Sequence, residues 1–88
     1  MNNDITNFKK KLIYRSQYRG TKEMDKLIGS FVETNINRFD DNDLMDLEKF
    51  LDIDDDDLYK FYNHLKSDLN FNDNYIINLF KNFKLEKK

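Results

Sequence analysis

Arg19 and Gly20 open the stretch of this sequence whose residue types best suit recognition of another protein. Glu23 and Asp25 follow, so one guanidinium and two carboxylates lie close to one of the chain's two glycines. An arginine can form paired hydrogen bonds to a carboxylate, and a glycine lets a partner approach without a Cβ in the way. Arg15 lies one helical turn before Arg19 and extends the patch. A simple connector between two helices explains the glycine equally well, so these residues alone favour neither a hinge nor a docking surface.

Asp52, Asp54 and Asp56 stand at the spacing of the first three ligands of an EF-hand calcium loop. Such a loop also needs a glycine at its sixth position and a glutamate at its twelfth. This sequence has Asp57 and Asn63 at those two positions. We therefore interpret the acidic run as a solvated helix cap, and we predict no metal-binding residues.

His64 is the only histidine, and the chain has no cysteine. The sequence pairs no Ser or Cys nucleophile with His64, which would act as its base. It also places no second metal ligand one helical turn from His64. No glycine-rich phosphate loop is present either. The sequence therefore predicts that the chain is not an enzyme, that it has no catalytic or cofactor-binding residues, and that His64 is a partly exposed helix residue.

The formal net charge of −2 hides a marked asymmetry. Residues 9–26 carry seven basic and two acidic side chains, whereas residues 40–57 carry ten acidic side chains and one lysine. A basic first helix is one property of nucleic-acid-binding proteins. The acidic middle of so small a chain would repel phosphates, however, and the sequence pI is about 5.3. We therefore predict no binding to nucleic acid.

No apolar run approaches the ~20 residues that span a bilayer. The N-terminal residues include a charged stretch, but no apolar segment follows it as in a secretory signal. These two observations predict a cytoplasmic protein without membrane insertion.

Apolar residues at helical spacing predict five helices joined by short polar connectors. The predicted fold class is all-α, a compact five-helix bundle that forms a single small domain over residues 1–88. Its ordered core is expected at about residues 4–84, with a frayed tail at 85–88. The first helix is expected to run from about Asp4 to Tyr18. The second is expected to begin at the cap Thr21, and the third at the cap Asp40 with Asp43 at the third helical position. The fourth is expected to begin at Asp55 or a neighbour as cap, and the fifth near Asn72 or Asp73.

Each predicted helix has one apolar face that we expect to be buried. The second has the clearest periodicity, and Gly29 is expected on its opposite side, where glycine costs about 1 kcal/mol relative to alanine. The expected core residues, in chain order, are Ile5, Phe8, Leu12, Met24, Leu27, Ile28, Phe31, Val32, Ile36, Leu44, Leu47, Phe50, Leu51, Leu58, Phe61, Tyr62, Leu65, Ile76, Leu79, Phe80 and Phe83.

The segment RSQYRGTKEMDKLIGSFV, residues 15–32, resembles the signature of the succinate dehydrogenase assembly factors, the flavinylation factors known in bacteria as SdhE. The hallmark of that family is an Arg-Gly pair followed by a glutamate and then an aspartate. Here these residues are Arg19, Gly20, Glu23 and Asp25. The acidic, leucine-rich residues 40–65 are similar to the family's third and fourth helices, so the resemblance extends over roughly residues 8–83.

The resemblance implies a bacterial, cytoplasmic assembly factor that binds the flavoprotein subunit of succinate dehydrogenase. The flavoprotein subunit of fumarate reductase is a further candidate partner. The factor would promote covalent attachment of FAD to a histidine of the flavoprotein, so the partner would carry the FAD and this chain would bind no cofactor stably. The chain is expected to be a monomer when free. The partner-binding residues implied by the resemblance are Arg15, Tyr18, Arg19, Gly20, Glu23 and Asp25.

An antitoxin-like regulatory binding protein is the alternative function. A small acidic protein suits that role as well, and the residues by themselves do not separate the two.

Overall fold

The computed structural model describes residues 3–63 and 74–84 and confirms the predicted all-α fold. The predictions for Leu65, for His64 and for the tail 85–88 fall outside the described residues. Within them lie the helices α1 (Asn3–Gln17), α2 (Lys22–Asn35), α3 (Asp41–Leu51), α4 (Asp55–Tyr62) and α5 (Tyr75–Asn82), and a short 3₁₀ turn η1 (Ile36–Arg38) between α2 and α3.

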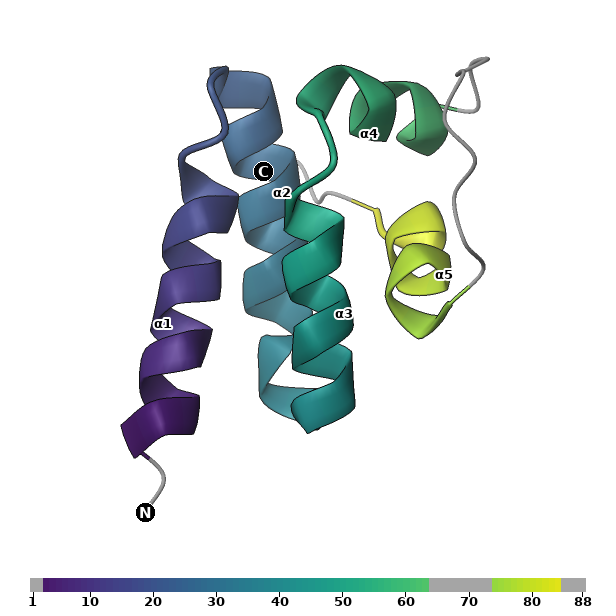
Figure 1. Cartoon of the computed structure of the whole chain (residues 1–88). Coiled ribbons are helices and arrows are strands. Elements are labelled where there is room, and N and C mark those ends of the chain that lie inside the picture. Colours follow the sequence, from purple (N-terminus) through teal and green to yellow (C-terminus); the bar gives the residue numbers. More distant parts are fainter. Residues whose placement is uncertain (1–2, 64–73, 85–88) are drawn as a thin grey trace.

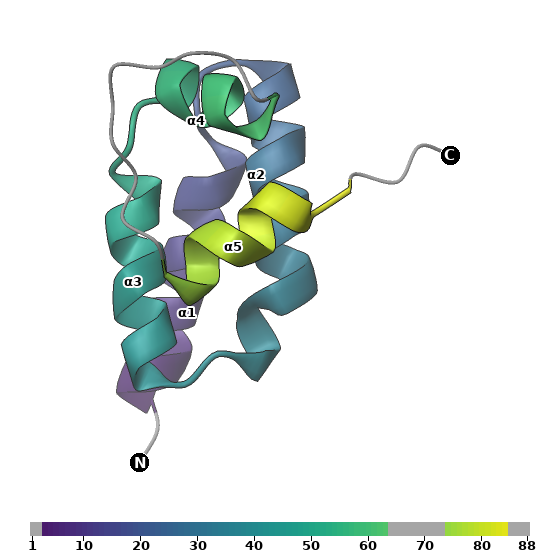
Figure 2. The same cartoon turned by 90° about the vertical axis from the view of Figure 1, so that its right-hand side faces the viewer.

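The three longest helices lie side by side, and the two shorter ones close the core from an end and a face (Figure 1). α1 packs against both α2 and α3. α4 lies across the end of the molecule where α1 ends and α2 begins, and α5 crosses the face opposite α1 (Figure 2). This arrangement leaves one long side of α1 at the edge of the described structure.

The N-termini of α2 and α3 are capped by the residues that the sequence predicts, Thr21 and Asp40. The Thr21 hydroxyl accepts the Met24 N–H at 3.2 Å. Asp40 accepts the Asp43 N–H at 2.9 Å, and the Asp43 carboxylate accepts the Asp40 N–H at 3.2 Å, which makes a reciprocal capping box. These side chains satisfy N–H groups that have no partner within the first helical turn.

One other predicted cap is confirmed, and two boundaries move by one or two residues. α1 ends at Gln17 instead of Tyr18. The cap of α4 is Asp54, the neighbour of Asp55. The cap of α5 is Asn74 instead of Asn72 or Asp73, because its side-chain oxygen accepts the Ile77 N–H at 2.8 Å.

Phe80 joins four helices at the centre of the hydrophobic core. Its side chain is fully buried on α5, and its ring centroid lies 5.3 Å from Phe31 of α2, 5.0 Å from Phe50 of α3 and 5.1 Å from Tyr62 of α4. The rings of Phe31 and Phe50 meet it edge-on, a favoured arrangement for aromatic pairs. Six of the expected core residues are only partly buried and pack against the core from its edge: Ile5, Phe8, Phe61, Tyr62, Leu79 and Phe83.

Gly29 lies away from the apolar stripe of α2, as expected, and the structure shows that this side is also buried. It is buried where α2 packs against α1. A Cβ added at this position would lie 3.2 Å from the Gln17 Cγ and 3.6 Å from the Ser16 carbonyl oxygen. The apolar stripe of α2 packs into the core, where Phe31 contacts Phe50 of α3 and Phe80 of α5. Gly29 belongs to a separate contact, between α2 and α1.

We expect Gly29→Leu to lower the free energy of unfolding by about 1–3 kcal/mol. The leucine side chain has no room beside Gln17, and the separation of α1 from α2 outweighs the higher helix propensity of leucine. Urea unfolding followed by circular dichroism measures the change. Thr34→Leu, at an exposed position of the same helix, is the matched control and should change the stability by less than about 0.5 kcal/mol. Equal stabilities of the two variants would contradict a tight α1–α2 contact at Gly29.

Candidate functional site at the end of α1

The connector between α1 and α2 turns at Gly20, which has a φ of 129°. Residues with a Cβ rarely adopt this conformation, so the backbone alone requires glycine here. Space does not require it, because a Cβ would lie 3.7 Å from an Asp55 carboxylate oxygen, an ordinary contact distance. Asp25 holds the turn in place by accepting the backbone N–H of Arg19 and, at 3.4 Å, that of Gly20.

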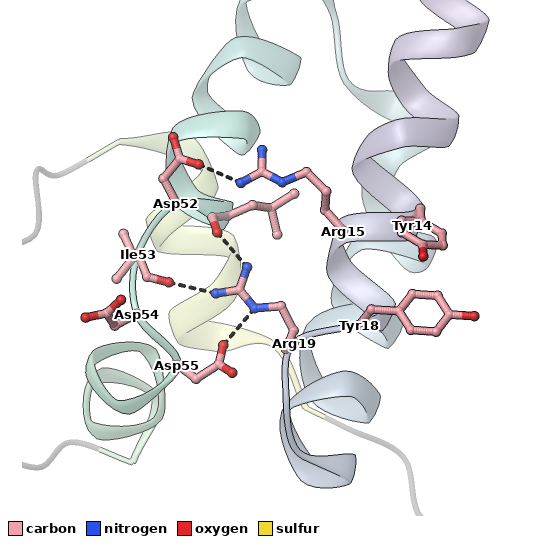
Figure 3. A pocket seen from close by; sticks show the side chains of 9 residues that line it. Tyr14, Arg15, Tyr18, Arg19, Asp52, Ile53, Asp54 and Asp55 are labelled. Atoms are coloured by element: carbon pink, nitrogen blue, oxygen red, sulfur yellow. Dashed lines mark hydrogen bonds and ion pairs between the residues drawn. The ribbon is translucent and has the colours of Figure 1, made fainter.

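Arg19 points from this turn toward the connector between α3 and α4 (Figure 3). Its Nη1 donates to the Leu51 carbonyl at 2.6 Å, and its Nη2 donates to the Ile53 carbonyl at 2.7 Å. Its Nε donates to the Asp55 carboxylate, also at 2.7 Å. The Arg19 side chain is only 9% exposed. We call these three interactions the Arg19 clamp.

The Arg19 clamp neutralises two helix ends at once. Leu51 is the last residue of α3, and the carbonyls of a final helical turn have no partner within the helix. A cation there also interacts favourably with the negative end of the α3 dipole. Asp55 is the first residue of α4, where a carboxylate stabilises the positive end of the dipole. A planar guanidinium can serve these three acceptors together, whereas a lysine ammonium is a single point charge.

A groove of about 480 Å³ runs beside the clamp, between the end of α1 and the connector. Arg15 crosses it and pairs with Asp52 at 2.5 Å. The Arg15 side chain is 30% exposed, so this pair is far more open to solvent than the Arg19 clamp. Tyr14 and Tyr18 form the outer rim, with ring centroids 4.4 Å apart, and project away from the connector (Figure 3).

Residues 10–84 match a protein family described as the flavinator of succinate dehydrogenase. The chain belongs to this family. The matched residues include the Arg-Gly turn, the Arg19 clamp and both sides of the groove.

Individual relatives of this flavinator family member agree with the assignment. Succinate dehydrogenase assembly factor 2 of Arabidopsis thaliana is 39% identical over 51 residues, which are 58% of this chain and 27% of the relative. FAD assembly factor SdhE of Acetobacter pasteurianus is 40% identical over 50 residues, 57% of this chain and 46% of the relative. The mitochondrial assembly factor 2 of Dictyostelium discoideum is 36% identical over 58 residues, 66% of this chain and 41% of the relative.

The aligned part of the chain thus spans less than half the length of each of these relatives. No solved structure matches the chain. None of these relatives is named as an antitoxin, so the comparisons give that alternative no support.

The six predicted partner-binding residues lie close together in the chain but face different surroundings. Arg15, Tyr18 and Arg19 line the groove, while Gly20 and Asp25 form the turn. Glu23 is exposed and lines a second, more apolar groove of about 360 Å³ between α2 and α4. The docking role of all six stays a prediction.

The carboxylate that orients the Arg19 guanidinium belongs to neither Glu23 nor Asp25. Asp55 pairs with the guanidinium, while Asp25 binds the backbone of the turn. Sequence reasoning missed Asp55 and the two carbonyl acceptors. They lie 32 to 36 residues from Arg19, and helical periodicity carries no information about partners at that separation.

Residues 3–63 and 74–84 contain neither a candidate metal site nor a helix that could span a membrane. No group of three or more His, Cys, Asp or Glu side chains there could hold a metal ion, and this includes the aspartates of the acidic run. None of the helices in these ranges has the length and apolar character needed to cross a membrane.

We expect Arg19→Ala to lower the free energy of unfolding by about 2–4 kcal/mol. The substitution leaves two carbonyls and one carboxylate without their partner in a sheltered place. Arg15→Ala is the matched control, since it removes another arginine of the same groove but only an exposed pair worth about 0–1 kcal/mol. Urea unfolding of both variants measures the difference. Arg19→Lys should recover little of the loss, because an ammonium cannot serve all three acceptors. A loss for Arg19→Ala no larger than that for Arg15→Ala would contradict the clamp.

Proposed function

We propose that this chain binds the flavoprotein subunit of succinate dehydrogenase and promotes covalent attachment of FAD to that subunit. The family match over residues 10–84 is the observation that supports the proposal most directly. The names of the relatives point the same way, since they describe succinate dehydrogenase assembly factors and an FAD assembly factor. The flavoprotein of fumarate reductase is a second candidate partner with similar chemistry.

The chain acts in this proposal without catalytic residues of its own. Flavin attachment requires the flavin ring, the acceptor histidine and groups that stabilise flavin charge to be aligned, and the flavoprotein holds all of them. A helper that binds one arrangement of the flavoprotein better than the others raises the population of that arrangement. Holding reacting groups in the correct geometry lowers the barrier by removing the search for that geometry. FAD remains with the partner throughout, and this chain holds no cofactor.

The turn and the groove have separate tasks within this function. Arg19, Gly20 and Asp25 form hydrogen bonds with other residues of the same chain, so they act by fixing the shape of the docking surface. The side chains of Tyr18 and Glu23 are exposed on either side of the turn and make no part of it, so we assign them to direct contact with the partner. Substitutions at the two groups of residues should therefore reduce flavinylation for different reasons.

We expect Tyr18→Ala combined with Glu23→Ala to reduce covalent flavin on a co-expressed flavoprotein by at least about threefold, because truncating residues at the centre of an interface weakens binding strongly. In-gel flavin fluorescence after denaturation measures the covalent product. The thermal midpoint of the variant should stay close to that of wild type, since both side chains are exposed. Gly20→Arg should lower both flavinylation and the thermal midpoint because of its backbone conformation.

Met45→Ala is the matched control, because Met45 is an exposed apolar residue of α3 away from the groove. It should leave flavinylation at the wild-type level. Covalent flavin that is equally abundant with and without the wild-type chain would exclude the proposed function. Full activity of the Tyr18 and Glu23 variant would exclude only the assigned contacts.

A further inference from the structure

The outer face of α1 carries four exposed residues that no part of the fold explains. We call Lys10, Lys11, Tyr14 and Tyr18 the α1 stripe. At 100° per residue Lys10, Lys11 and Tyr14 fall within about 100° of arc on α1. Tyr18 directly follows the last residue of α1, and its ring contacts that of Tyr14. The opposite face of α1 packs on the core through Leu12 and its neighbours.

The aromatic half of the α1 stripe is an exposed apolar platform. Tyr14 is 63% exposed and Tyr18 is 66% exposed, the two highest values among the large exposed hydrophobic residues described. Their rings contact each other at 4.4 Å, with an angle of 33° between the planes. Tyrosine offers a large contact area with few rotatable bonds, and it is enriched at the centres of protein interfaces.

The basic half of the α1 stripe has charges that the described fold leaves unneutralised. In the part of the chain that the structure describes, neither Lys10 nor Lys11 has an ion-pair partner. No acidic residue lies between Ile5 and Tyr18 in the sequence. The acidic connector borders the other side of Tyr14 and Tyr18, which point away from it (Figure 3). The α1 stripe therefore presents positive charge beside an aromatic surface.

We propose that the α1 stripe is a docking face for a carboxylate-bearing surface of the flavoprotein. Acidic side chains of the partner would pair with Lys10 and Lys11, while an apolar part of the same surface packs on Tyr14 and Tyr18. The inference rests on the proposed function and extends the docking surface about two turns along α1, beyond the Arg-Gly turn.

Charge complementarity favours a protein partner over a nucleic acid. A nucleic acid also offers stacking and negative charge, but its binding depends on neutralising several phosphates in a row. The ten acidic side chains of residues 40–57 belong to a molecule whose radius of gyration is only 12.8 Å, close to the Debye length of about 10 Å at 0.1 M salt. An extended polyanion would experience their repulsion, whereas a compact acidic patch on a protein meets the α1 stripe alone.

The test measures binding of the full chain to the purified flavoprotein subunit before flavin attachment, by biolayer interferometry at two salt concentrations. Lys10→Glu with Lys11→Glu should raise the Kd by at least about tenfold at low salt and should weaken its dependence on salt. Tyr14→Ser with Tyr18→Ser should raise the Kd by about tenfold and leave the salt dependence unchanged. All four positions are exposed, so circular dichroism spectra should match those of wild type.

Lys81→Glu and Tyr75→Ser are the controls, at exposed positions of α5. Both should bind as wild type does. Stripe variants that bind the flavoprotein as tightly as the controls overturn this inference and leave the proposed function intact. A wild-type chain that does not bind the flavoprotein overturns both. Binding of a fluorescent single-stranded oligonucleotide that the stripe variants lose, while flavoprotein binding is unchanged, assigns the α1 stripe to nucleic acid and also overturns the inference.

Discussion

The geometry of this site depends on the hydrogen bonds and the ion pair that the Arg19 guanidinium makes. The guanidinium joins the end of α1 to the last carbonyl of α3, to the connector and to the first residue of α4. These segments are far apart in sequence. A sheltered cation that bonds to three acceptors defines their relative positions more strictly than hydrophobic contact could, because hydrogen bonds are directional.

The other motif residues support that interaction. Gly20 lets the chain reverse direction immediately after Arg19, and Asp25 fixes the backbone of the turn. The motif is therefore largely engaged inside the molecule. An arginine next to a glycine near a helix end resembles an exposed docking site in sequence, yet here its donors are directed inward. Substitutions in such a motif can abolish partner binding without removing any direct contact, because they change the surface that the motif shapes.

Periodicity and capping chemistry were sufficient to predict the five helices, most of the core and the caps Thr21 and Asp40. These features depend on residues within a few positions of one another. Gly29 could not be placed, because a single apolar stripe describes only one neighbour of a helix and α2 has several. The three acceptors of Arg19 could not be found for a related reason. Two of them are backbone carbonyls, which every residue has and which leave no mark in a sequence.

The strong charge asymmetry of the chain gains a structural meaning from the same arrangement. Arg15 and Arg19 pair with Asp52 and Asp55, so basic and acidic segments meet along one line between α1 and the connector. Their charges largely cancel at that line, and each segment keeps its net charge on the side that faces away from it. Lys10 and Lys11 remain on the outer side of α1, beside the two tyrosines, while the acidic residues remain on the side of α3 and α4. A partner that recognises this polarity can dock in only one orientation, as the proposed function requires.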